Sequence, residues 1–331
     1  MRLAFHILTC SLLAWCAAIP TAMAGELDDL ASAKALTDEN KQSIKKAVED
    51  GVKELESSDV NLVTKAREDL SGWSDGAATP VFRGEFSKAA CGPLYELVLR
   101  AEPIQAVNAI EVLRVVETNE ALQQLARLAN AITVTNVGVR LAASRALHTA
   151  IEAGTDMNSA QANGLIDKIE LATERESEWA CSYSQLTALS SIAKRSGMDA
   201  TVISAARAGQ VAGLDEIAKK VAKRDAKDAQ LMKSASRVLA AMRRDLANAS
   251  AAERSVLAEQ LLPVVKSLLA AGSAPPAGLS ANETSAYADT VRTANQMLSD
   301  VLQVSGKPAA KPGGKPTGKP AAKPAPKNST N

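Results

Sequence analysis

Three acidic residues at helical spacing are the side chains of this sequence best placed for acid–base chemistry. Asp167, Glu170 and Glu174 fall on one face of a predicted helix, and Glu178 follows at the same spacing. Paired carboxylates act as general acid and base where a cleft moves their pKa values apart, as in enzymes that cleave glycans. Because the chain holds few aromatic residues to bind such a substrate, we expect a solvated acidic face, with a carboxylate enzyme as the alternative.

The chain has few residues that could support histidine-dependent catalysis or bind a metal ion. His148 is the one histidine beyond residues 1–24, and Glu152 follows it by one helical turn, which predicts an ion pair rather than catalysis. Zinc sites need several closely spaced Cys or His ligands, and the sequence has none. It also lacks a Gly-x-Ser-x-Gly nucleophile motif, a phosphate-binding glycine loop and a calcium loop. The sequence therefore predicts a protein that is not an enzyme and that uses no metal or other cofactor.

The chain begins with the pattern of a secretory signal peptide. Arg2 precedes an apolar stretch from Leu3 to Ile19, and Ala22-Met23-Ala24 forms a small-x-small cleavage site. Cleavage after Ala24 predicts an exported protein, periplasmic or secreted. No later stretch approaches about 18 consecutive apolar residues, so we expect the mature chain to be soluble and to have no membrane span.

Two cysteines, Cys91 and Cys181, remain beyond the predicted signal peptide. An exported protein can join such a pair, but a disulfide requires Cα atoms within about 7 Å of each other. The separation of the two cysteines in the sequence corresponds to about two helical repeats, which places them on the order of 20 Å apart in a regular repeat array. A Cys91–Cys181 disulfide would therefore indicate a compact bundle, and free thiols are compatible with an array.

The chain turns basic from Lys219 onward. Lys220, Arg224 and Lys227 share one face of a predicted helix, which could dock an anionic polymer. Acidic residues lie one helical turn from several of these cations, as on an ordinary exposed helix. We expect an exposed, ion-paired helix, with polymer docking as the alternative. The full basic set is Lys219, Lys220, Lys223, Arg224, Lys227, Lys233, Arg237, Arg243 and Arg244.

The last residues differ completely from the rest of the chain. Lysine recurs at every fourth position, and proline follows all but the last of these lysines; the six are Lys307, Lys311, Lys315, Lys319, Lys323 and Lys327. These six and Arg2 leave 31 basic against 37 acidic residues in 25–304, so an acidic body carries a cationic tail. Proline at this density predicts an extended, disordered segment.

The lysine-, alanine- and proline-rich tail resembles the tails of linker histones, and this resemblance implies weak binding of polyanions. Export argues against nucleic acid as the partner, and leaves anionic lipids, acidic glycans and other polymers of the cell envelope. A spacer without a partner is the equal alternative.

Helical periodicity fills the body of the chain and predicts an all-α fold. Apolar residues recur at three- and four-residue intervals over 104–116, 122–129, 139–151, 256–269 and 287–302. Ser250 with Glu253, and Ser280 with Glu283, have the spacing of capping boxes. Six glycines and prolines, together with aromatic residues, interrupt this pattern from Gly72 to Pro93, which predicts a long ordered loop over 75–93.

One segment resembles the second helix of a HEAT repeat. Residues 136–147 place Val139-Arg140 before Ala143 and Leu147 at that family's offsets, after a polar residue. The resemblance covers about 90 residues and is lost beyond Trp179, where the helices look longer. It implies a HEAT-like array of helical hairpins, an α-solenoid, that binds macromolecules on a concave face. The alternative is a compact Ala-rich helical bundle.

These expectations define a domain plan and a function. The plan is a signal peptide at 1–24, a helical segment at 25–74, the loop at 75–93, a helical-repeat body at 94–304 and the tail at 305–331. We expect an exported, non-catalytic helical scaffold that binds a protein or a component of the cell envelope, with the tail as tether or spacer. The alternatives are an extracytoplasmic enzyme that uses paired carboxylates, and a purely structural protein of the envelope.

Overall fold

The computed structural model describes residues 27–74, 78–304 and 306, and within them the chain is helical and has no strand. A short helical segment at 27–31 comes first. The longer helices that follow are α2 (Asp38–Leu55), α3 (Val60–Ser74), α4 (Pro80–Arg100), α5 (Pro103–Val115), α6 (Asn119–Leu128), α7 (Val137–Glu152), α8 (Ser159–Arg175), α9 (Trp179–Ala193), α10 (Ala200–Ala222), α11 (Leu231–Asn248), α12 (Ala251–Gly272) and α13 (Ala281–Val304), with a 3₁₀ turn η1 (Ala226–Asp228) before α11. The all-α prediction is confirmed.

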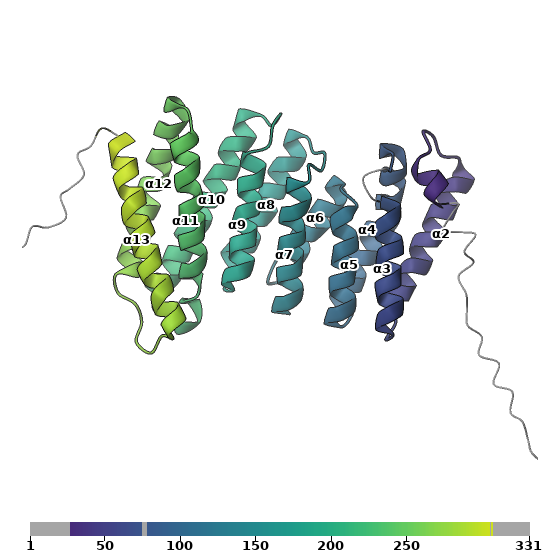
Figure 1. The fold of residues 1–331 in the computed structure, drawn as a ribbon, viewed down its shortest axis with the longest axis horizontal. Coiled ribbons are helices and arrows are strands. Elements are labelled where there is room, and N and C mark those ends of the chain that lie inside the picture. Colours follow the sequence, from purple (N-terminus) through teal and green to yellow (C-terminus); the bar gives the residue numbers. More distant parts are fainter. Residues whose placement is uncertain (1–26, 75–77, 305, 307–331) are drawn as a thin grey trace, which may run out of the picture.

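The helices pack as a two-layered array of hairpins (Figure 1). Each even-numbered helix contacts the next even-numbered one, and α2, α4, α6, α8, α10 and α12 form one layer. The odd-numbered helices α3, α5, α7, α9, α11 and α13 form the other layer in the same way. Each even-numbered helix also packs on the odd-numbered helix that follows it. The structure is thus an array of consecutive helix pairs rather than a compact bundle.

The hairpins repeat at a regular interval through most of the array. Their first helices begin at Asp38, Pro80, Asn119, Ser159 and Ala200, a spacing of roughly 40 residues that is typical of helical repeats. The next hairpin begins later, at Ala251, because α10 is long and η1 follows it. The helices beyond Trp179 are longer, as predicted, yet the two layers continue through them to α13.

Small and branched aliphatic residues form the core of every hairpin. Leu113, Leu125 and Leu189 are fully buried, and alanines such as Ala143 let neighbouring helices approach closely. Polar residues at helix starts satisfy backbone N–H groups that have no partner within the helix. Both predicted capping boxes form, since the Ser250 and Ser280 side chains exchange hydrogen bonds with the glutamates three residues later.

The loop predicted over 75–93 is wrong for residues 80–93, which belong to helix α4. Pro80 occupies the first turn, where a missing N–H costs nothing, and the Thr79 hydroxyl accepts a hydrogen bond from Phe82 N. Phe82 and Phe86 lie one turn apart and are both fully buried, so their packing outweighs the weak helix preference of glycine. Both rings therefore belong to the core.

Helix α12 is the one candidate for a membrane span, by length and composition alone, among the described residues. This differs from the sequence analysis, which found no such stretch. In the array α12 packs against α10 and α13, and Leu261, Val265 and Leu268 are buried there. The helix continues through Pro263. Its apolar face is therefore a core face of the array.

The predicted signal peptide at 1–24 and the six tail lysines from Lys307 to Lys327 lie outside the described residues. Both remain predictions from the sequence.

Candidate functional site

The acidic residues singled out in the sequence line a groove between α8 and α10. Asp167, Glu170 and Glu174 lie along it, and Glu216 adds a fourth carboxylate from α10, around a volume of about 430 Å³. Burial, and then the nearby charge of Asp167, raise the pKa of the Glu170 carboxyl. Glu178 belongs elsewhere, because it accepts a hydrogen bond from Gln230. The groove thus gathers three of the four predicted residues.

Close packing of α8 on α10 explains the glycines of this groove. A Cβ atom at Gly209 would clash with the Glu170 carboxylate, and one at Gly213 would clash with Leu186. The rest of the lining is Leu171, Ala212 and backbone, so no aromatic side chain lines the groove among the described residues. The raised pKa favours the protonated form of Glu170, but the groove offers no platform for a sugar ring.

His148 and the two cysteines occupy structural positions. His148 Nε2 lies 3.1 Å from Glu152 Oε1, which confirms the predicted pairing. Cys91 and Cys181 are free thiols in α4 and α9, so the disulfide that the sequence analysis left open does not form. Burial raises the pKa of each thiol to about 12, with Glu176 adding to the effect at Cys181. Neither thiol is poised as a nucleophile.

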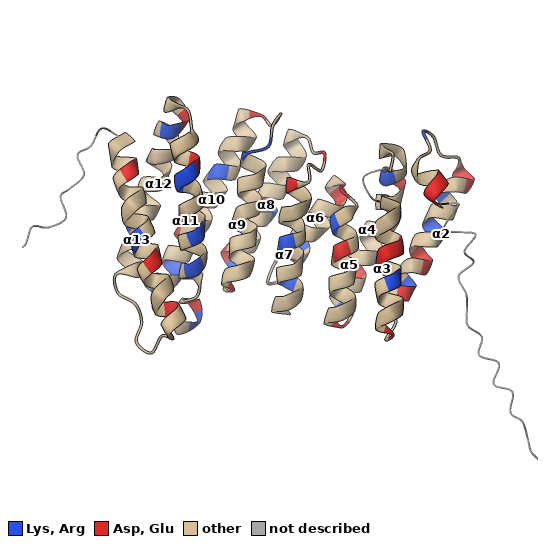
Figure 2. Cartoon of the chain, in the orientation of Figure 1, with Lys and Arg blue, Asp and Glu red and all other residues tan. Residues whose placement is uncertain are grey.

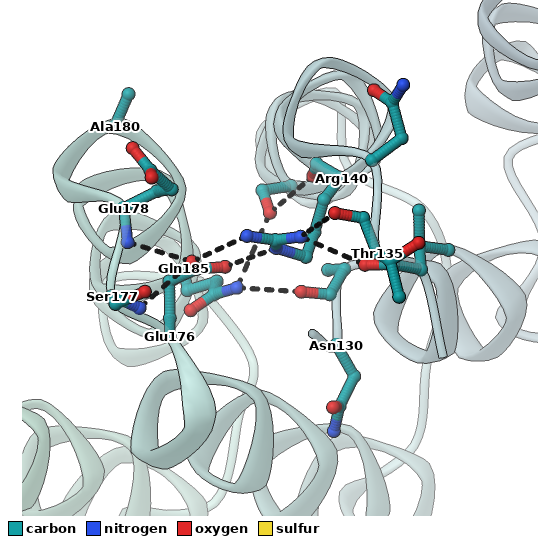
Figure 3. A network of polar contacts seen from close by, with 12 residues as sticks. Asn130, Thr135, Arg140, Glu176, Ser177, Glu178, Ala180 and Gln185 are labelled. Carbon is teal, nitrogen blue, oxygen red and sulfur yellow. Dashed lines mark hydrogen bonds and ion pairs between the residues drawn. The ribbon is translucent and has the colours of Figure 1, made fainter. Parts of the chain in front are cut away.

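The Arg140 side chain of the HEAT-like segment is the centre of a buried polar network (Figure 3). Its guanidinium donates from Nε to Glu176 Oε2 at 2.7 Å and from Nη2 to Glu176 Oε1 at 3.0 Å. Nη1 donates to the carbonyls of Val134 and Thr135 at 2.9 and 3.1 Å. The exposed fractions of the two side chains are 5 % for Arg140 and 0 % for Glu176.

This network joins two neighbouring hairpins. Glu176, in the turn between α8 and α9, also accepts hydrogen bonds from the backbone N–H groups of Ser177 and Glu178. Gln185 of α9 donates to the Ala129 carbonyl, just after α6. Val139, Ala143 and Leu147, the other predicted signature residues, are buried in α7. These four residues of α7 are therefore buried, where Arg140 connects neighbouring hairpins, and they form no binding surface.

The cationic face predicted for Lys220, Arg224 and Lys227 does not form. Helix α10 ends at Ala222, and Arg224 follows with a φ of 61°. Lys220 donates to the carbonyls of Glu174 and Glu176 and so caps the end of α8. Lys227 belongs to η1 and pairs with Asp225 at 3.0 Å. The prediction failed because it assumed one continuous helix through these positions.

A cluster of aromatic and cationic residues on the odd-numbered layer is the strongest candidate for a binding site. Trp179 and Tyr183 lie one turn apart at the start of α9, and Lys233 and Arg237 lie one turn apart on α11. Lys233 Nζ stands 3.9 Å from the centre of the Trp179 ring, and the Arg237 guanidinium carbon stands 4.9 Å from it. Arg237 also stands 5.6 Å from the centre of the Tyr183 ring. We call these four residues the aromatic–cation cluster.

The aromatic–cation cluster lies at the surface. Both cations are exposed and both rings are half-buried, and Figure 2 shows the basic residues distributed along α11. A cation over an aromatic face is attracted by the ring, and both remain available to a partner. The sequence analysis named Trp179, Lys233 and Arg237 but did not group them. The matching one-turn spacings were the available signal, and only the packing of α9 on α11 brings the pairs together.

Comparisons with known proteins identify no relative. No family model and no curated protein matches the chain. Among solved structures, an engineered protein known from its crystal structure is similar over 86 % of this chain and 67 % of its own, with 17 % identity and a TM-score of 0.41. A second, described as a computational design of self-assembling cyclic homooligomers, is similar over 85 % of this chain and 98 % of its own, with 13 % identity and a TM-score of 0.26.

Proposed function

We propose that this chain is an exported, non-catalytic helical-repeat scaffold that binds a protein or a component of the cell envelope across its odd-numbered layer. The observation that carries the proposal is the aromatic–cation cluster, which presents an indole, a phenol and two cations on the surface of adjacent helices. Tryptophan, tyrosine and arginine are the residues that most often dominate the binding energy of protein interfaces.

The architecture supports a scaffold of the α-solenoid type. The hairpins repeat in two layers, and Arg140 is buried near the start of the second helix of its hairpin. In such arrays each repeat contacts its neighbours only, so the outer face of a layer is free for a partner. The cationic tail from Lys307 to Lys327 would act as a tether or spacer, and the signal peptide would place the scaffold outside the cytoplasm.

Co-sedimentation with isolated cell envelopes tests this proposal. The mature chain is compared at low and high salt with a Trp179→Ala/Arg237→Ala variant and with a chain that ends at Val304 and so lacks the tail lysines. Residues that dominate interfaces each contribute about 2 kcal/mol or more, so we expect the variant to bind at least about 30-fold more weakly. A matched control, Trp73→Ala/Lys65→Ala, removes one indole and one exposed cation from α3 at the other end of the array.

The outcome separates the scaffold from the tail. If the cluster variant loses binding, the control keeps it and salt has little effect, the odd-numbered layer holds the partner. If only removal of the tail lysines abolishes binding and high salt does the same, the cluster is not the binding site and the proposal fails in this form.

The acidic groove supports a second candidate, an extracytoplasmic enzyme acting on glycans. The specific observation is that Glu170 lines a groove with three other carboxylates and that its pKa is raised, which is one of the properties of a general acid. Incubation of the mature chain with cell-wall glycans, followed by an assay for new reducing ends, tests it. Activity that Glu170→Gln removes would establish the enzyme, and absence of new reducing ends with the wild-type chain would reject it.

A further inference from the structure

A cavity at the C-terminal end of the array is lined by arginines. It has a volume of about 870 Å³ and lies between α11, the first turns of α12, and α13. Arg243 and Arg244 come from α11, Arg254 from α12 and Arg292 from α13. We call it the arginine pocket. Its volume falls in the range of small-molecule binding sites.

Neighbouring groups hold two of these arginines in place. Arg243 donates from Nε to Asp300 Oδ2 at 2.5 Å and from Nη1 to Gln296 Oε1 at 2.8 Å. Arg254 donates to the Ala249 carbonyl at 2.9 Å, at the end of α11. These hydrogen bonds join α11 to α13 and α12, so they fix the wall of the arginine pocket and use only part of each guanidinium.

The other two arginines keep most of their donors for a ligand. Arg292 pairs with Asp289, one turn away on the same helix, and its side chain is 71 % exposed. Arg244 is exposed and makes no hydrogen bond or ion pair with the described residues. A guanidinium carries five N–H donors, so the lining offers far more donors than its own groups accept.

The charge of the lining points to an anion. Four arginines line the cavity together with one acidic residue, Asp300. Guanidinium groups bind phosphate oxygens through pairs of parallel, charge-assisted hydrogen bonds, which makes arginine the preferred residue for such groups. Three helices converge here, so a ligand with several oxyanion groups can contact more than one arginine at once.

We propose that the arginine pocket binds a multivalent phosphate-type anion, carried by a soluble polymer or by lipid headgroups. The site is separate from the aromatic–cation cluster and does not depend on its role.

Calorimetric titration of the full mature chain with inorganic tripolyphosphate at low salt tests the assignment. The pocket variant is Arg244→Gln/Arg292→Gln, which removes two exposed arginines that do not connect helices. The control is Arg175→Gln/Lys219→Gln, which makes the same change in net charge on the even-numbered layer. Both control positions are exposed, and both side chains are ion-paired. We expect the pocket variant to bind at least about tenfold more weakly, because charge-assisted hydrogen bonds are lost, and the control to bind within about threefold of the wild type.

Two further arms separate the pocket from the tail and the polymer from the lipid. A variant with all six tail lysines replaced by glutamine should keep most of its affinity for tripolyphosphate. Vesicles of phosphatidylcholine with added phosphatidylglycerol show whether the same arginines bind headgroups. Pocket-dependent binding to tripolyphosphate alone assigns a soluble polymer, and pocket-dependent binding to vesicles as well assigns a lipid surface. Equal binding by the pocket variant and the control in both arms overturns the proposal, as does loss of binding in the tail variant alone.

Discussion

Breaking the Arg140–Glu176 pair should destabilise the array strongly, and mainly at the junction between the two hairpins that this pair joins. Replacing Glu176 by glutamine keeps an oxygen for the backbone N–H groups of Ser177 and Glu178 but leaves the guanidinium of Arg140 buried without a counter-ion. Removing one partner of a buried ion pair costs about 3–5 kcal/mol. All four hydrogen bonds of the guanidinium are 3.1 Å or shorter, and both side chains are buried. We therefore expect a loss of stability within this range of free energy.

The assay combines thermal unfolding with hydrogen exchange. At about 2–4 °C per kcal/mol for a chain of this order of size, Glu176→Gln should lower the Tm by roughly 6–20 °C. In a repeat array the loss should concentrate near the altered junction. Amides of α7 and α9 should therefore exchange faster, while those of α2 and α3 change little.

Controls make this prediction refutable. Lys219→Gln breaks the pair with Asp215 on the surface of α10 and should leave the Tm unchanged. Arg140→Met combined with Glu176→Gln should recover part of the loss, because no buried charge then remains unpaired. If Glu176→Gln has the same Tm as the wild type and its α7 amides exchange no faster, the pair does not hold the hairpins together and the prediction is wrong.

Three further predictions follow from single sites. Cys91 and Cys181 should resist a thiol reagent at pH 8 in the native protein, because burial raises the pKa of each thiol to about 12. Both should react once the protein is denatured. If the denatured protein does not react in the absence of a reductant, the two cysteines form a disulfide and the prediction is wrong. Glu170→Gln should raise the Tm at neutral pH. The pKa of Glu170 is higher in the folded than in the unfolded protein, so the wild type loses stability as the pH rises from the unfolded to the folded pKa. Below about pH 4 the carboxyl is protonated in both states, and the Tm values of the two proteins should converge. Gly213→Ala should destabilise the array by roughly 1–3 kcal/mol through overpacking against Leu186, whereas Gly164→Ala, with open space around it in α8, should stabilise it by about 0.5–1 kcal/mol in urea unfolding.

The sequence predicted the helices well because their apolar positions repeat at helical intervals and their ends carry capping residues. It failed over 80–93, where glycine and proline indicated a loop. Pro80 starts the helix instead, and Pro93 lies inside it. The burial of Phe82 and Phe86 against neighbouring helices decides the outcome, and such tertiary packing cannot be read from local preferences.

The same limit applies to the candidate sites. Local spacing placed three of the four acidic residues on one face correctly, because they belong to a single helix, α8. It misplaced Lys220, whose side chain caps a helix distant in the sequence. It missed both Glu216 at the acidic groove and the meeting of Trp179 with Lys233, since each joins residues from different hairpins. Pattern within one helix is visible in the sequence, and contact between repeats is not.

The array determines how charge is distributed among these sites. On the even-numbered layer, glycines of α10 let the Glu170 side chain of α8 approach closely, so binding there would have to displace a tight helix contact. On α11, Lys233, Arg237 and Arg244 stand on the outer side and are exposed. They connect the aromatic–cation cluster to the arginine pocket along one helix, a distance of about 15 Å at 1.5 Å per residue. A single elongated partner can therefore contact both sites, and the change in affinity on combining the cluster and pocket variants measures it: if one ligand contacts both sites, its loss of affinity on combining them should be close to the product of the two separate losses, because effects at distant sites add in free energy, whereas a ligand of one site alone should lose no more than with that site's variant.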